Sequence, residues 1–175
     1  MVKPYFPHDP ADILKALNAS RVKYLVVGGV AVIFHGVLRT TLDLDLAVHL
    51  EVGNLKKLEE VMHRLGFSPR VPASVTGLAD SRTRRVWTRQ KHMKVFSFTE
   101  HRKPFRIVDV MVRPLPDFER LYRTRVTVKH GGVSAPVMPL SALMKMKLAA
   151  GRVQDREDVQ YLHIVQQKMR RRATA

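Results

Sequence analysis

The chain has 175 residues, enough for one domain with a small helical appendage and for a hydrophobic core without covalent cross-links. It contains no cysteine, which excludes a disulfide framework, a thiolate metal site and a cysteine nucleophile. Its 31 Lys and Arg against 15 Asp and Glu leave a net charge of +16, which favours polyanionic partners such as nucleic acid.

The first half of the chain has the pattern of helices alternating with short strands. Asp9-Pro10 is a typical helix start, because Asp caps free amides and Pro fits the first helical position. Apolar and polar side chains alternate after position 41, as they do in a half-buried strand. The expected elements are a helix after Pro10, a strand at 23–27, a helix at 30–35, a strand at 42–48 and a helix at 53–65.

The second half of the chain has a strand-rich region followed by helices. His130-Gly131-Gly132 lies between two β-prone segments, which indicates a hairpin. Asp155 and Asp158 are interpreted as the N-cap and the acid at the third position of the last helix. The expected elements are a loop at 69–81, strands at 84–89, 93–98 and 105–112, a short helix at 116–122, hairpin strands at 124–128 and 133–137, and helices at 140–150 and 155–168.

This order of elements indicates an α/β (α+β) fold, in which helices flank a mixed β-sheet. We expect residues 1–138 to form the core, and residues 139–175 to form a C-terminal helical appendage packed on it with a basic tail. No apolar stretch is as long as a membrane span, and residues 1–10 lack the apolar core of a signal peptide. We therefore expect a cytoplasmic protein with no membrane partner.

Two glycines, Gly28-Gly29, stand at the turn from the strand at 23–27 into the next helix. Glycine adopts backbone conformations closed to other residues and lets a ligand approach the main chain closely. The amides at the start of the following helix attract phosphate. The turn is therefore a candidate phosphate site, and a turn that only reverses the chain is the alternative.

Three aspartates lie in predicted strands with apolar neighbours, where burying a carboxylate is unfavourable. Asp43 and Asp45 are two residues apart on one strand, so their carboxylates face the same side, roughly 6.5–7 Å apart along the chain. Asp109 interrupts the apolar strand at 105–112. If these strands are neighbours, three carboxylates meet, and Mg²⁺ prefers such oxygen ligands together with substrate phosphates. Solvated acids on an exposed strand face are the alternative for the Asp-x-Asp pair.

These motifs resemble the nucleotidyltransferase superfamily of polymerase-beta type. Its members carry Gly-Gly or Gly-Ser after an apolar residue, Asp-x-Asp about ten residues later, and then an apolar–Asp–apolar triplet. The matching segments here are Val27-Gly28-Gly29, Asp43-Leu44-Asp45-Leu46 and Val108-Asp109-Val110. Residues 28–45 look closer still to AbiEii-like and other toxin–antitoxin nucleotidyltransferases.

The resemblance implies a mixed sheet with Asp43, Asp45 and Asp109 on adjacent strands, holding two Mg²⁺ or Mn²⁺ ions against a nucleoside triphosphate. It also suggests a cognate toxin or antitoxin protein as a partner. Members with Gly-Ser use the serine hydroxyl on the triphosphate, whereas this chain has Gly29 there. We therefore expect its phosphate contacts at Gly28-Gly29 to come from backbone amides.

Three further residues are candidates for nucleotide binding. Arg39 and Thr41 match the Arg-x-Thr that precedes Asp-x-Asp in the toxin–antitoxin branch. Arg39 either neutralises triphosphate charge or pairs with an Asp and orients it. Lys147 shares the helical face of Leu143, Met144 and Leu148, so its ammonium either reaches out to solvent or serves a phosphate. His35 lies in the matching motif and is interpreted as a supporting residue.

The charge excess is concentrated in residues 81–106, which hold nine Lys or Arg and one acid, Glu100. Strands here would project cations on a common face, which favours RNA as the acceptor or as a regulatory ligand, with tRNA the first choice by analogy to toxin relatives. Trp87 is either a base-stacking residue or part of the core. A solvated basic face is the alternative.

The leading hypothesis is a metal-dependent nucleotidyltransferase that moves a nucleoside monophosphate to an acceptor hydroxyl, with Asp109 assisting deprotonation. The second hypothesis is an inactive binding module with the same fold, an antitoxin or adaptor that binds RNA or an acidic partner.

Overall fold

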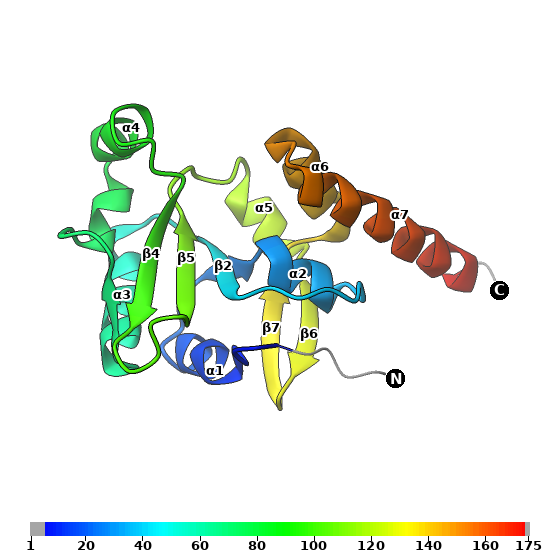
Figure 1. Ribbon diagram of the computed structural model, residues 1–175, viewed down its shortest axis with the longest axis horizontal. Coiled ribbons are helices and arrows are strands. Elements are labelled where there is room, and N and C mark those ends of the chain that lie inside the picture. Colours follow the sequence, from blue (N-terminus) through cyan, green and yellow to red (C-terminus); the bar gives the residue numbers. More distant parts are fainter. Residues whose placement is uncertain (1–5, 174–175) are drawn as a thin grey trace.

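The computed structural model describes residues 6–173, and within them a seven-stranded sheet forms the centre of the molecule (Figure 1). Its strand order is β3-β4-β5-β2-β1-β7-β6. The pairs β2–β5 and β1–β7 are parallel and the other neighbours are antiparallel, so the predicted mixed sheet is confirmed. The strands are β1 (Tyr24–Val26), β2 (Asp43–Val48), β3 (Phe67–Pro69), β4 (Val95–Glu100), β5 (Ile107–Met111), β6 (Val126–His130) and β7 (Val133–Val137).

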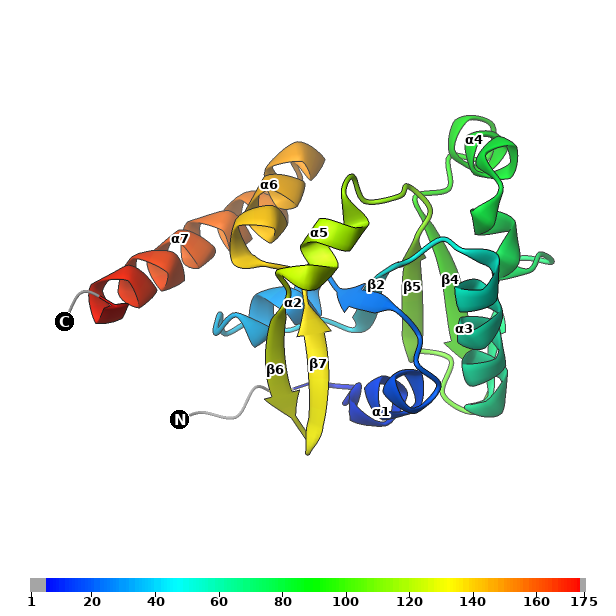
Figure 2. The same ribbon diagram turned by 180° about the vertical axis from the view of Figure 1, so that it is seen from behind.

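Helices lie on both faces of this sheet (Figures 1 and 2). The pair α1 and α3 covers one face, whereas α2 lies on the other and contacts β2 and α6. From α6 the chain turns into α7, which extends away from the sheet. The helices are α1 (Ala11–Ala19), α2 (Gly28–Phe34), α3 (Val52–Arg64), the 3₁₀ helix η1 (Val75–Ala79), α4 (Ser81–Arg89), α5 (Phe118–Arg123), α6 (Leu140–Ala150) and α7 (Val153–Ala173).

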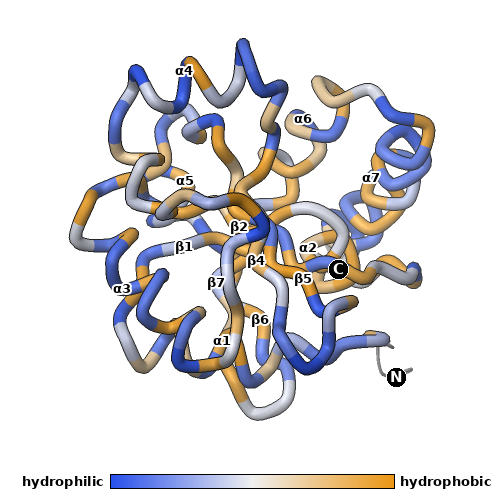
Figure 3. The backbone as a smooth tube through the Cα atoms, turned by 60° about the vertical axis from the view of Figure 1, so that its left-hand side comes forward, coloured by the Kyte–Doolittle hydropathy of each residue, from blue (hydrophilic) through white to orange (hydrophobic). Residues whose placement is uncertain are grey.

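The core follows from the alternation of side chains along the central strands. Leu44 and Leu46 are buried, while Asp43 and Asp45 on the other face are only partly buried. In β5 the buried valines flank Asp109 in the same way. Figure 3 shows these apolar strand segments in the middle of the molecule and hydrophilic stretches around it. One face of each strand therefore stabilises the fold by burying apolar area, which leaves the other face available for polar chemistry.

The segment predicted as a strand at 84–89 is instead helix α4. Its start is fixed by Asp80, whose carboxylate accepts hydrogen bonds from the Thr83 amide and the Thr83 hydroxyl, both at 2.7 Å. Trp87 is the buried residue of this helix and stacks on Phe96 with ring centroids 5.6 Å apart. Local β-propensity was therefore overridden by capping and by the packing of one aromatic ring, and Trp87 belongs to the core.

The C-terminal helices are present, but two details differ from expectation. Helix α7 begins at Val153, so Asp155 and Asp158 lie inside it, and the predicted capping box is wrong. Both carboxylates point inward to Lys147. Leu148, expected on the inward face of α6, is 58 % exposed. The division of the chain at 138/139 stays a prediction. Among the described residues, no helix combines the length and the apolar character that crossing a membrane requires.

Candidate active site

The three predicted carboxylates lie on one face of two neighbouring strands. Strands β2 and β5 are parallel, and their register pairs Asp45 directly with Asp109. Asp43 is two residues before Asp45 and therefore shares its face. All three line one pocket with a volume of about 390 Å³. The register of a single strand pair thus brings together acids that are 64 residues apart in the sequence, as counted from Asp45 to Asp109.

These carboxylates destabilise each other's charged forms. Burial, the Asp109 carboxylate and the Asp43 carboxylate raise the pKa of Asp45 to about 6, against the lowering effects of the Gly29 amide and of Lys147. Burial and Asp109 also raise the pKa of Asp43, which Arg70 and His8 partly offset. The Oδ1 atom of Asp109 is buried and has no hydrogen-bond partner in residues 6–173. A bound cation would relieve all three costs.

The glycine pair is required by the close approach of Asp45. Gly28 has φ +61°, and a Cβ built on it would lie 1.9 Å from Asp45 Oδ2. A Cβ on Gly29 would lie 2.5 Å from the Thr41 hydroxyl oxygen. The Gly29 amide donates a hydrogen bond to the Asp45 carboxylate. The first role of the turn in this structure is therefore to seat Asp45, with Thr41 packed beside it.

Arg39 and Lys147 reach the same pocket but are held by two acids of α7. Arg39 Nη1 lies 2.5 Å from Asp158 Oδ2, and Lys147 Nζ lies 2.7 Å from the same oxygen. Lys147 Nζ also lies 3.0 Å from Asp155 Oδ1. Arg39 thus pairs with an aspartate, as one of its two predicted roles required, but with one outside the strand motif. The network joins the loop before β2 to α6 and α7.

The carboxylates of the pocket are the kind of ligand that a divalent cation needs, although in this structure they are not at the spacing of a metal site. In residues 6–173, no three His, Cys, Asp or Glu side chains are already grouped as a ligand set. The donor chemistry nevertheless fits Mg²⁺ or Mn²⁺, because three carboxylates face one pocket and the buried Asp109 Oδ1 has no partner among the described residues. Mutual repulsion of the acids opposes a tighter grouping in the absence of positive charge.

Several residues of the pocket were not predicted as site residues from the sequence. Gln154 and Asp155 come from the start of α7, and Arg152 precedes it. Lys94 belongs to the basic segment, but nothing in its pattern pointed to the site. The complete lining is Val27, Gly28, Gly29, Arg39, Thr41, Asp43, Asp45, Lys94, Val95, Asp109, Met111, Met146, Lys147, Ala150, Arg152, Gln154 and Asp155.

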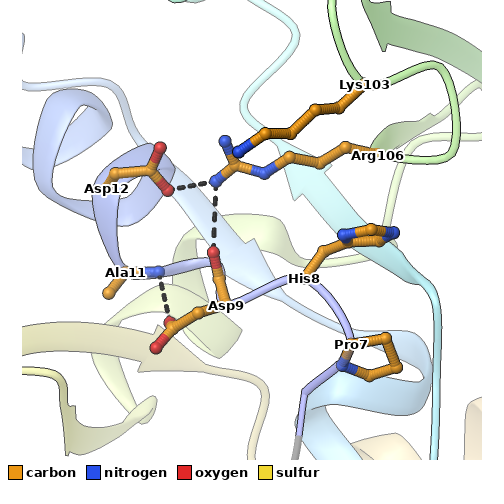
Figure 4. A pocket seen from close by; sticks show the side chains of 7 residues that line it. All are labelled: Pro7, His8, Asp9, Ala11, Asp12, Lys103 and Arg106. Atoms are coloured by element: carbon orange, nitrogen blue, oxygen red, sulfur yellow. Dashed lines mark hydrogen bonds and ion pairs between the residues drawn. The ribbon is translucent and has the colours of Figure 1, made fainter.

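The basic segment at 81–106 does not form one surface. Strand β4 separates α4 from the loop before β5, and its six residues span about 17 Å. At the far end of β4, Lys103 and Arg106 line a second hollow, also of about 390 Å³, beside the N-terminal residues (Figure 4). There Arg106 pairs with Asp12 and Glu100. The predicted single cationic face is therefore wrong, because residues 84–89 are helical and the two ends are far apart.

His35 supports the fold of the site region. Its ring is buried, and Nε2 donates a hydrogen bond to the Met138 carbonyl oxygen at 2.8 Å. Burial lowers the pKa of His35, while the bond to Met138 opposes that shift. The neutral ring therefore ties the end of α2 to the segment that follows β7, which is the supporting role expected from the sequence.

Comparisons with solved structures place this arrangement among known folds. No protein-family model matches the chain, and no curated protein matches it by sequence. The lincomycin-bound lincosamide antibiotic adenylyltransferase LnuA superposes with TM-score 0.59 at 14% identity, over 88% of this chain and 94% of that one. ANT(2'')-Ia in complex with adenylyl-2''-tobramycin superposes with TM-score 0.53 at 12% identity, over 92% and 94%.

A third structure is an antigenic nucleotidyltransferase-like protein from Paracoccidioides brasiliensis. It superposes with TM-score 0.54 at 14% identity, over 87% of this chain and 72% of that one. Identities this low report on the fold, and the AbiEii-like branch stays a prediction. The mixed sheet, its helices and these neighbours show that the chain has the nucleotidyltransferase fold.

Proposed function

We propose that the protein is a metal-dependent nucleotidyltransferase that transfers a nucleoside monophosphate from a nucleoside triphosphate to an acceptor hydroxyl. The observation that carries this proposal is the register of β2 and β5, which pairs Asp45 with Asp109 in a pocket that Asp43 also lines. Acids in a shared and partly buried pocket cost stability, so their placement points to a ligand of opposite charge.

Asp43, Asp45 and Asp109 would hold two Mg²⁺ or Mn²⁺ ions, whose charge stabilises the negative charge that develops on the phosphate oxygens. The acceptor oxygen forms a bond to the α-phosphorus, the bond between the α- and β-phosphates breaks, and pyrophosphate leaves. Asp109 is the candidate to accept the hydroxyl proton, because its Oδ1 faces no competing donor within the described residues.

Residues on the other wall would bind the nucleotide. Arg39 and Lys147 carry the positive charge that a triphosphate requires, and their present partners, Asp155 and Asp158, compete with phosphate for them. Thr41 lies beside the glycine turn and can donate its hydroxyl proton to a phosphate oxygen. The Gly29 amide already donates a hydrogen bond to Asp45. The role we assign to Gly28-Gly29 is therefore to leave room for the substrate and the Asp45 carboxylate to approach the backbone closely.

The acceptor hydroxyl belongs to a small molecule, an RNA or a protein side chain. The names of the structural neighbours concern a lincosamide and tobramycin, which are antibiotics that those proteins bind or carry as adenylyl products. RNA, and tRNA first, is favoured here by helix α4, since residues 81–94 hold six Lys or Arg and no acid. Lys94 connects this helix with the pocket. A cognate toxin or antitoxin protein stays a prediction from sequence resemblance.

The test is transfer of label from each α-labelled nucleoside triphosphate with Mg²⁺ or Mn²⁺. Candidate acceptors are total RNA, tRNA, lincomycin and tobramycin. We expect labelled product with one acceptor, and a loss of at least 100-fold, on the order seen for other catalytic groups, in Asp45→Asn and Asp109→Asn. Glu157→Gln, an exposed acid on α7, is the matched control. Metal-independent RNA binding without transfer would instead support the inactive binding module.

A further inference from the structure

Two unpaired oxygens mark the pocket. Within residues 6–173, the buried side-chain oxygen or nitrogen atoms without a hydrogen-bond partner are Asp109 Oδ1 and Asp155 Oδ2. Both residues line the candidate active site, Asp109 from β5 and Asp155 from the first turn of α7. Buried polar atoms are almost always paired, so each exception needs an explanation. The proposed chemistry explains the unpaired oxygen of Asp109, but it does not explain the unpaired oxygen of Asp155.

Asp155 is held firmly in the position that leaves this oxygen free. Its side chain is 13 % exposed, and its Oδ1 accepts a hydrogen bond from Lys147 Nζ at 3.0 Å. Lys147 is itself fixed by Asp158, whose Oδ2 also accepts from Arg39. The carboxylate is therefore oriented through Lys147, and no group in the described part of the chain offsets the cost of desolvating Oδ2.

The chemistry of the free oxygen limits what it can bind. An ionised carboxylate only accepts hydrogen bonds, and it repels phosphate. Arg39 and Lys147 balance the charges of Asp155 and Asp158, so Oδ2 needs no further cation while these pairs are in place. A neutral donor fits best, and a hydroxyl is the commonest neutral donor on a nucleotide close to its phosphates.

We propose that Asp155 Oδ2 accepts a hydrogen bond from a ribose hydroxyl of the bound nucleoside triphosphate, so that Asp155 selects ribonucleotides over deoxyribonucleotides. This inference rests on the proposed function, since it needs a nucleotide in the pocket. Asp45, Lys147 and Asp155 line the same pocket, and Lys147 contacts Asp155 directly. The sugar would therefore lie on the α7 side, one side chain away from the strand carboxylates.

The experiment is calorimetric titration of the full chain with the nucleoside triphosphate that binds tightest, and with its 2'-deoxy and 3'-deoxy forms, in Mg²⁺. For the wild type we expect about tenfold weaker binding of the 2'-deoxy form, the loss expected for one hydrogen bond to a charged group, and no such loss for the 3'-deoxy form. In Asp155→Asn the Lys147 contact is kept on the remaining carbonyl oxygen, but an NH2 donor replaces Oδ2 and cannot accept the hydroxyl proton, so the ratio between the ribo and 2'-deoxy forms should fall toward one.

Glu157→Gln removes the same charge from the same helix at an exposed position and should keep the wild-type ratio. A merely structural role of Asp155 would weaken all three nucleotides equally and leave the ratio unchanged, which would overturn the inference. A wild type that binds ribo and deoxy forms equally would also overturn it while leaving the proposed function intact. Absence of any nucleotide binding would overturn both.

Discussion

Among single residues, Asp45 is the carboxylate whose ionised form the fold disfavours most clearly. Its carboxylate lies against Gly28 and the Gly29 amide, and it faces Asp109 across the strand pair. Its pKa is raised to about 6 in the folded chain, whereas the pKa of an Asp in an unfolded chain is about 3.9. Function and stability are therefore opposed at this position.

The raised pKa gives a pH-dependent prediction for Asp45→Asn in EDTA. Between the two pKa values the folded state binds more protons than the unfolded state, so the wild type loses stability as pH rises from about 4 through about 6. The variant lacks this loss and should be more stable than the wild type at neutral pH, by roughly 3 kcal/mol. Chemical denaturation across pH measures it. A variant less stable than the wild type at pH 7 would identify Asp45 as a structural partner.

Gly28 gives a second residue-scale prediction, because two costs coincide there. Gly28→Ala places a methyl group 1.9 Å from Asp45 Oδ2 and strains a backbone with φ +61°. At Gly132, with φ +77°, a methyl group would meet no atom of the described residues within 4 Å, so Gly132→Ala carries the backbone strain alone, about 1–2 kcal/mol. We expect Gly28→Ala to cost more than Gly132→Ala in thermal melts and to abolish transfer. Equal costs would mean that Asp45 moves aside freely.

At the scale of elements, helix α4 presents cations that its folding does not need. Trp87 and the Asp80 cap hold the helix, and Arg84 Nη1 donates to the carbonyl oxygens of Leu78 and Ala79. Arg82, Arg85 and Arg89 lie at i, i+3 and i+7 on an exposed face, where like charges repel. An external polyanion would remove that repulsion.

Replacing Arg82, Arg85 and Arg89 with Gln should therefore weaken tRNA binding without lowering stability. Each lost phosphate contact should reduce the slope of log affinity against log salt by about one. Replacing the exposed Lys15, Lys56 and Lys57 with Gln removes the same charge from α1 and α3 and is the control. If both triple variants lose the same affinity, only net charge matters and α4 is not an RNA surface.

At the scale of the whole molecule, the parts predicted correctly were those with a local signal. The alternation around Asp43 and Asp45 predicted β2, and the apolar flanks of Asp109 predicted β5. The prediction of a strand at 84–89 was wrong because one buried aromatic ring and one helix cap outweighed the β-propensity of these residues. Sequence patterns carry little information about such tertiary contacts.

The ion pairs that Arg39 and Lys147 form with Asp155 and Asp158 could not be predicted from the sequence for the same reason. Asp158 lies 119 residues from Arg39, and no periodicity connects them. Asp155 and Asp158 also have the spacing of a capping box, and that local interpretation concealed their inward direction. Long-range ion pairs become visible only when α6 and α7 are placed beside the loop that precedes β2.

The proposed function requires that Asp43, Asp45 and Asp109 together hold two divalent ions with a nucleoside triphosphate. The direct measurement is the number of Mn²⁺ ions bound per chain, counted by electron paramagnetic resonance with and without nucleoside triphosphate. We expect two ions per wild-type chain when nucleotide is present, and fewer than one in Asp45→Asn and in Asp109→Asn, with Glu157→Gln unchanged. Equal Mn²⁺ binding by wild type and Asp45→Asn, or nucleotide binding that is unaffected by EDTA, would contradict the proposed function.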